Sequence, residues 1–237
     1  MYKVAFSPSQ QVKNEYIGVT TTEKIEMEKL AQACHKHHVA KGGEALTFAY
    51  PKDVFDTRPT LAKDFGAEVY IALHTNGGGG SGTETFYAAG WPISKKLCTL
   101  MNDKLTAYFE KGGFKNTRSG PVQMKSLYEV TKPASFGMPH CYIEVNFHDN
   151  VPIAKYMVSR WDAIAKVIVD TIWEFKGWVE KVPVVVAPDK IAPDFYYYRV
   201  CLSSYKSRNA AYDEVARLSK ENGLSAFVAY VNTPTKK

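Results

Sequence analysis

No apolar stretch of the sequence approaches the length of a membrane span, so we expect no transmembrane helix. The N-terminal residues 1–11 lack a basic segment followed by an apolar one, and we therefore expect no ordinary signal peptide. Only four cysteines occur in the 237 residues, and no two form a CxxC pair. Cys34, Cys98 and Cys141 lie in apolar patterns, which predicts buried free thiols rather than a disulfide framework. These absences indicate synthesis in the cytoplasm.

Long runs of like charge are absent too. The formal charge of +6 comes from 30 basic and 24 acidic side chains that are spread along the chain. A mildly basic surface suits a polyanion such as nucleic acid, an anionic membrane or a cell wall with teichoic acids. The sequence has no nucleic-acid recognition motif and no concentrated basic stripe, so we do not expect nucleic acid as a partner.

Patterns of strands and helices alternate through the first three quarters of the chain. We expect strands at residues 2–6, 45–50, 68–74, 83–88 and 141–145. We expect helices at residues 24–40, 61–64, 94–111 and 151–175, and an irregular segment at 112–139. This alternation predicts an α/β layered domain over residues 1–178.

The composition of the sequence changes after this domain. Residues 179–194 are predicted to form a linker, because residues 181–194 contain three prolines. Residues 195–237 read as a strand, a helix and a second strand, which is a small βαβ unit. Such a unit is small for an independent core, so half a domain is the natural interpretation.

Histidines are scarce, and most of them favour structural roles. Three of the six, His35, His37 and His38, lie near the expected C-terminus of the first helix, where partly charged imidazoles complement the helix dipole. His74 differs, because it ends an apolar strand and precedes the glycine-rich loop 76–82. Ligands of open α/β sheets bind at the carboxyl ends of the strands. His74 is therefore a candidate site residue.

Two acidic residues fit the same site. Glu144 lies within the apolar strand CYIEVNF, where an unpaired carboxylate would be costly, so it is paired, protonated or functional. Glu23 follows Thr22, a plausible N-cap of the first helix. Together with His74 these residues predict one site at the carboxyl edge of the sheet.

Five motifs in order resemble a known family: SPSQQxxN near the start, TEK at Thr22–Lys24, AEVYIALHTN at Ala67–Asn76, GTETFY at Gly82–Tyr87 and YIEVNFHDN at Tyr142–Asn150. Residues 2–176 resemble the zinc-dependent N-acetylmuramoyl-L-alanine amidases of type 3, particularly those of endolysins and sporulation autolysins. The resemblance implies a three-layer α/β/α fold with a mostly parallel twisted sheet. It also implies Zn²⁺ as cofactor, Glu23 and His74 as zinc ligands, and Glu144 as the catalytic carboxylate. The substrate would be peptidoglycan, cleaved between N-acetylmuramic acid and L-alanine.

One departure from the family pattern concerns the metal. The family usually has a histidine just after the first strand, and this sequence has Pro8-Ser9-Gln10-Gln11 there. Counting from Pro8 favours Gln10, whereas a likeness to phage-type SPSxQ sequences favours Gln11; both stay open, with a preference for Gln11. The alternative hypotheses are a non-catalytic peptidoglycan-binding protein with a degenerate zinc site, and a zinc peptidase that attacks within the stem peptide.

Other polar residues have less specific functional assignments. Asn76, Thr83 and Asn150 are candidate substrate contacts, and Arg58 resembles a structural arginine of the family. Three residues before Glu144 are candidates to border the site without an assigned role: Lys125, Tyr128 and Glu129.

The C-terminal unit has its own resemblance. Residues 196–231 resemble part of a SPOR-type domain, a family that binds peptidoglycan, through YRV, SRNAA and NGLSAF. Because only half of such a domain is visible, a second copy of the chain would complete it as a homodimer; otherwise the unit is a small packing element. The predicted role is cell-wall lysis, by a phage or prophage endolysin released through a holin or by a bacterial autolysin, such as a sporulation enzyme that lyses the mother cell from inside.

Overall fold

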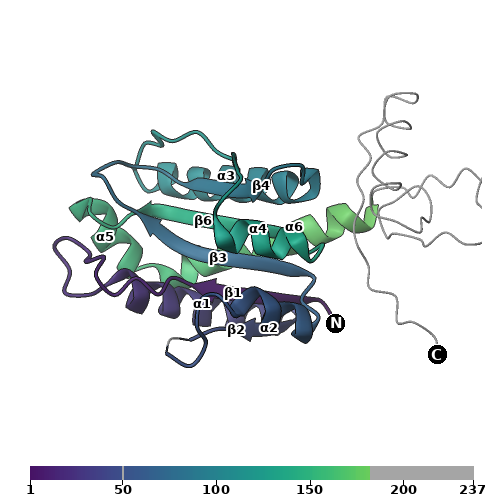
Figure 1. Cartoon of the computed structure of the whole chain (residues 1–237). Helices are drawn as coiled ribbons and strands as arrows, with labels where there is room; N and C mark the ends of the chain where they lie inside the picture. Colours follow the sequence, from purple (N-terminus) through teal and green to yellow (C-terminus); the bar gives the residue numbers. More distant parts are fainter. Residues whose placement is uncertain (50, 182–237) are drawn as a thin grey trace, which may run out of the picture. The chain divides into compact units, whose positions relative to one another are not determined.

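The computed structural model describes residues 1–49 and 51–181 (Figure 1). The chain divides into two units, Met1–Trp173 and Glu174–Lys237, and the first of them carries the α/β domain. The SPOR-like unit at 195–237, with the dimer inferred from it, lies outside the described residues, as does the linker beyond residue 181. None of the helices within the described ranges is long and apolar enough to cross a membrane.

Six strands form one sheet in the order β2-β1-β3-β6-β4-β5. The first four strands in this order are parallel, while β4 runs antiparallel to β6 and parallel to β5. A mostly parallel sheet, as the sequence predicts, is therefore confirmed. The strands are β1 Lys3–Pro8, β2 Glu44–Thr47, β3 Val69–Asn76, β4 Glu84–Ala88, β5 Val122–Met124 and β6 His140–Phe147.

Helices cover both faces of this sheet, which confirms the three-layer arrangement. Side chains alternate between the faces of a strand, and β1 shows which helices lie on each side. The ring of Phe6 packs edge-on against His38 of α1, with the centroids 6.1 Å apart. The next residue, Ser7, points to the other face and bonds with Arg58 of α2 and Glu129 of α4. The helices are α1 Glu23–Ala40, α2 Arg58–Phe65, α3 Pro92–Lys111, α4 Tyr128–Ser135, α5 Val151–Val158 and α6 Trp161–Lys181.

The segment 112–139, expected to be irregular, contains β5 and α4, so that prediction was wrong. Gly120 and Pro121 precede β5, and Pro133 lies inside α4, so residues typical of loops hide both elements in the sequence. The single helix expected over 151–175 is divided into α5 and α6, because α5 ends at Val158 with Ser159 as its C-cap.

Buried polar groups far from the predicted site have structural partners. His38 is fully buried, with Nε2 2.9 Å from Tyr2 O and Nδ1 accepting the indole N–H of Trp173 at 3.2 Å. His35 Nδ1 lies 3.0 Å from Thr47 Oγ1. Cys34, Cys98 and Cys141 are buried free thiols, as expected. The structural interpretation of the histidine cluster thus agrees with its contacts.

Candidate active site

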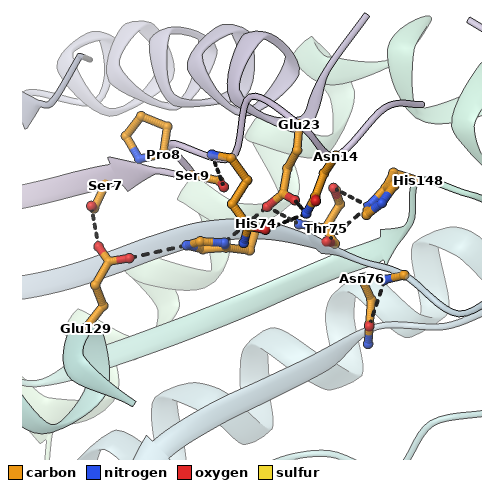
Figure 2. A network of polar contacts seen from close by, with 12 residues as sticks. Ser7, Pro8, Ser9, Asn14, Glu23, His74, Thr75, Asn76, Glu129 and His148 are labelled. Atoms are coloured by element: carbon orange, nitrogen blue, oxygen red, sulfur yellow. Dashed lines mark hydrogen bonds and ion pairs between the residues drawn. The ribbon is translucent and has the colours of Figure 1, made fainter. Parts of the chain in front are cut away.

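Three of the predicted site residues meet where parallel strands end. His74 and Glu144 are register partners on the neighbouring strands β3 and β6, so their side chains lie on the same face of the sheet. Glu23 is the first residue of α1, after the N-cap Thr22, and a carboxylate is favourable at this end of a helix. Its Oε1 atom lies 3.1 Å from His74 Nδ1 (Figure 2). The structure therefore brings Glu23, His74 and Glu144 together, although the first and the last are 121 positions apart in the sequence.

A second carboxylate contacts the other side of the imidazole. Glu129 of α4 places Oε2 3.2 Å from His74 Nε2, and Figure 2 shows His74 between Glu129 and Glu23. The phenol ring of Tyr142 stacks on the His74 ring, with the centroids 4.3 Å apart and the planes 17° from parallel. Both ring nitrogens and one ring face of His74 are thus occupied by protein groups.

These contacts change the protonation of His74 and its partners. Burial lowers the pKa of His74, but the hydrogen bonds of Glu129 and Glu23 and the charges of Glu129 and Glu144 outweigh burial and raise it to about 10. Burial raises the pKa values of Glu23 and Glu129, and the hydrogen bond and charge of His74 bring both below the usual range. These pKa shifts favour an imidazolium between two carboxylates.

Glu144 has the opposite character. Burial raises its pKa to about 7, opposed by the charge of His74 and reinforced by that of Glu23. Its Oε2 atom is buried and has no hydrogen-bond partner among the residues that the structure describes. A buried carboxyl oxygen without a partner is costly, and such groups mark sites where a ligand or water supplies the missing contact.

The two glutamines after β1 point in different directions. Gln10 donates its amide to Asp53 O at 2.7 Å, whereas Gln11 Oε1 accepts from Asn14 Nδ2 at 2.5 Å. The same nitrogen of Asn14 donates to Glu23 Oε2 at 2.6 Å. Gln11 is therefore the glutamine that lies beside Glu23, linked to it by one shared amide group.

The candidate substrate contacts lie around the glycine-rich loop 76–82. Asn76 Oδ1 accepts from Gly77 N at 2.9 Å, and Asn150 Nδ2 donates to Gly80 O at 3.0 Å. Thr83 is fully buried and donates its hydroxyl to Val145 O at 2.8 Å. Asn76 and Asn150 thus border the loop, while the structure does not place Thr83 at the surface.

The donor set determines whether these residues fit a metal ion. Within the described ranges, no group of three or more His, Cys, Asp or Glu side chains is arranged to hold one. Glu23 and His74 supply a carboxylate and an imidazole, two donors that zinc accepts, and the Gln11 amide oxygen is the third donor nearby. Glu129 and Glu144 add negative charge around His74, which a divalent cation would offset. The residues therefore fit a divalent cation, with an amide oxygen where an imidazole would bind more tightly.

Comparison with known proteins decides the family. The family model described as N-acetylmuramoyl-L-alanine amidase matches residues 13–174, more than half of the 237-residue chain. The chain belongs to the N-acetylmuramoyl-L-alanine amidase family. The enzyme class expected from the sequence, an amidase acting on peptidoglycan, is thereby confirmed. The match begins after Gln10 and Gln11, so it does not include the segment where the sequence departs from the family pattern.

Solved structures of amidases share this fold. The amidase AmiC2 of Nostoc punctiforme is 14% identical with a TM-score of 0.61, covering 74% of this chain and 97% of that chain. The amidase from Clostridium difficile 630 is 18% identical with a TM-score of 0.60, at 74% and 97% coverage. Ami1 from Mycobacterium smegmatis is 16% identical with a TM-score of 0.60, at 75% and 97% coverage. At these identities the likeness shows the amidase fold. Among curated proteins, no match was found.

Two residues that contact Glu23 or His74 had no role assigned to them in the sequence analysis. Asn14 is the last residue of the motif SPSQQxxN, and the motif alone does not reveal its contacts with Gln11 and Glu23. Glu129 was placed only at the border of the site, because the proline in α4 made its segment look irregular. The available signal in the sequence was an acidic residue directly before the apolar Val130, which is buried in the structure. Charged side chains are seldom fully buried without a partner, so an acidic residue at such a position points to a specific contact.

Proposed function

We propose that this amidase hydrolyses the amide bond between N-acetylmuramic acid and L-alanine with a zinc ion held by Glu23, His74 and Gln11. The observation that carries the proposal is the 3.1 Å contact between Glu23 and His74 beside the register partner Glu144, whose Oε2 has no partner within the described part of the chain. A zinc ion in this position would lower the pKa of a water molecule and polarise the amide carbonyl.

Glu144 is proposed to move the proton. Its pKa of about 7, raised by burial, lets the carboxyl group accept and release a proton with comparable ease near neutral pH. As general base it takes a proton from the attacking water, whose oxygen forms the new bond to the carbonyl carbon. As general acid it gives that proton to the alanine nitrogen when the C–N bond breaks. The products are the lactyl carboxylate of muramic acid and a free peptide amine.

Digestion of purified peptidoglycan tests the proposal. The full-length protein should release peptides that begin with L-alanine and leave intact glycan strands, as identified by mass spectrometry. A chelator should stop the release, and added zinc should restore it. New termini inside the stem peptide would instead indicate a zinc peptidase, and binding without any release would indicate a non-catalytic wall-binding protein.

The role of Glu144 needs a matched variant. Glu144→Gln keeps the shape of the side chain and removes its ability to carry the proton, so release should fall by roughly 10²- to 10⁴-fold. Glu84→Gln is the control, because Glu84 pairs in register with Glu144 from the neighbouring strand β4. Equal loss in both variants, or none in Glu144→Gln, would contradict the assignment.

We further propose that the biological role is cell-wall lysis, as a phage or prophage endolysin or a bacterial autolysin. The family membership supports an action on the wall. Lysis of intact cells by externally added protein, compared with lysis after co-expression with a holin, would separate the two roles.

A further inference from the structure

The carboxylate of Glu129 occupies the side of His74 that faces away from Glu23. Glu129 Oε2 lies 3.2 Å from His74 Nε2, while Glu23 Oε1 lies 3.1 Å from His74 Nδ1. Figure 2 shows Glu129 reaching the His74 ring on the side opposite to Glu23. Nothing in the proposed hydrolysis uses this carboxylate, although it contacts the central residue of the site.

Two hydroxyl groups hold the Glu129 carboxylate in place. Its Oε1 atom accepts hydrogen bonds from Ser7 and, at 2.6 Å, from Tyr70. Tyr70 is fully buried, and Glu129 is only 2% exposed. Rotation of this buried carboxylate would break both hydrogen bonds, which is costly for buried polar groups. Glu129 therefore presents Oε2 to His74 in a fixed direction.

A buried arginine offsets the charge of this carboxylate. Arg58 is 1% exposed and donates from Nη1 to Ser7 Oγ at 3.1 Å and to Pro8 O. A buried carboxylate without a compensating charge would be strongly destabilising, so the charge of Arg58 adds to that of His74 in stabilising Glu129 beside the sheet. Through Ser7, this network joins β1, α2 and α4 to the imidazole on β3.

We propose that Glu129 is a positioning residue that holds His74 with its Nδ1 atom directed at the metal position beside Glu23. This inference rests on the proposed function, since it assumes that zinc is bound there. Histidines that bind metals usually donate their other ring N–H to a carboxylate or carbonyl, which fixes the tautomer and the ring orientation. When Nε2–H is donated to Glu129, Nδ1 is the nitrogen whose lone pair is available to a cation.

Glu129→Gln tests this role with little change in volume. A glutamine has a single acceptor oxygen, so it cannot accept from both hydroxyls and from His74 in the way the carboxylate does. Zinc affinity of the full-length protein, measured by competition with a chromogenic chelator, should fall by roughly 10- to 100-fold. Tyr70→Phe removes one of the two hydroxyl donors and should produce a smaller loss, which keeps the test informative if Glu129→Gln does not fold.

Glu26→Gln is the matched control. Glu26 is also a fully buried carboxylate, and it accepts hydrogen bonds from Thr21, Lys29 and Trp161 rather than from His74. Its substitution should lower the stability of the protein and leave zinc affinity at the wild-type value. Equal weakening of zinc binding in Glu26→Gln and Glu129→Gln would overturn the inference, because any buried carboxylate would then have the same effect.

A spectroscopic measurement separates positioning from a merely structural role. In the zinc-loaded wild type, ¹⁵N–¹H NMR of the histidine rings should show His74 with a slowly exchanging proton on Nε2. Glu129→Gln should lose that signal even where circular dichroism shows a native fold. An unchanged signal with unchanged zinc affinity would overturn the inference and leave the proposed function intact. A wild-type protein that binds no zinc would overturn the proposed function, and this inference with it.

Discussion

The stability of this amidase should depend on pH through His140, at the start of β6 and outside the candidate site. His140 is fully buried, and burial lowers its pKa to about 4, although its hydrogen bond with Met138 O opposes the shift. Its Nε2 atom accepts the backbone N–H of Ala88 at 3.0 Å, while Nδ1 lies 3.0 Å from Met138 O. The neutral ring with its proton on Nδ1 satisfies both contacts, whereas a proton on Nε2 would break the first.

The sign and the magnitude of this pH dependence follow from the linkage between proton binding and folding. An unfolded histidine titrates near pH 6.5, so between about pH 6.5 and pH 4 the unfolded chain binds a proton that the folded chain does not. The contribution of His140 to stability is therefore present above about pH 6.5 and is lost as the pH falls toward 4. At pH 5 the difference amounts to about 2 kcal/mol relative to pH 7.5.

Urea unfolding at pH 7.5 and pH 5 measures this contribution. His140→Gln keeps an acceptor oxygen for the Ala88 N–H and removes the titration, so it should lose about 2 kcal/mol less than the wild type over that interval. Other titrating groups are common to both proteins and cancel in the comparison. Equal losses in the two proteins would refute the reasoning and show that the pKa of His140 is the same in the folded and the unfolded chain.

Two further predictions concern the metal ligands and the loop beside them. Gln11→His should raise zinc affinity on the order of tenfold, or about 1.4 kcal/mol, because Gln11 lies beside Glu23. Gln10→His should leave zinc affinity unchanged, because Gln10 is turned toward Asp53. A gain from Gln10→His alone in a chelator titration would contradict this geometry. Gly80→Ala should lower the free energy of unfolding in urea by about 1–3 kcal/mol, because a Cβ atom there would lie 2.6 Å from Cζ of the adjoining phenylalanine ring. A variant as stable as the wild type would show that this ring moves aside freely.

Much of the fold and part of the site could be predicted from sequence. The apolar runs that become β3 and β6 indicated buried parallel strands, and parallel strands bring their carboxyl ends to one edge. His74 and Glu144 could therefore be assigned to one site, and the family resemblance added Glu23. The order of parallel strands in the sheet brings these residues together, and short apolar runs in a sequence predict such strands well.

The contacts around His74 could not be predicted in the same way. The hydrogen bond from His74 to Glu129 joins residues 55 positions apart, and it depends on the placement of α4 over the sheet. With Pro133 inside α4, the local pattern favours a loop, so neither the helix nor its buried carboxylate stands out. The preference for Gln11 over Gln10 likewise depends on which way a loop side chain turns, and sequence spacing alone left that open.

The glycine-rich loop after β3 has a consequence for the kind of ligand that it admits. Consecutive backbone N–H groups of such loops often form a nest that binds phosphate or another anion. Here Asp149 Oδ2 accepts the N–H groups of Gly78 at 2.6 Å and Gly79 at 2.9 Å, so the chain supplies the anion itself. A phosphorylated ligand would have to displace an attached carboxylate and would be repelled by it. Occupation of these N–H groups by Asp149 thus disfavours nucleotides and phosphosugars at this loop.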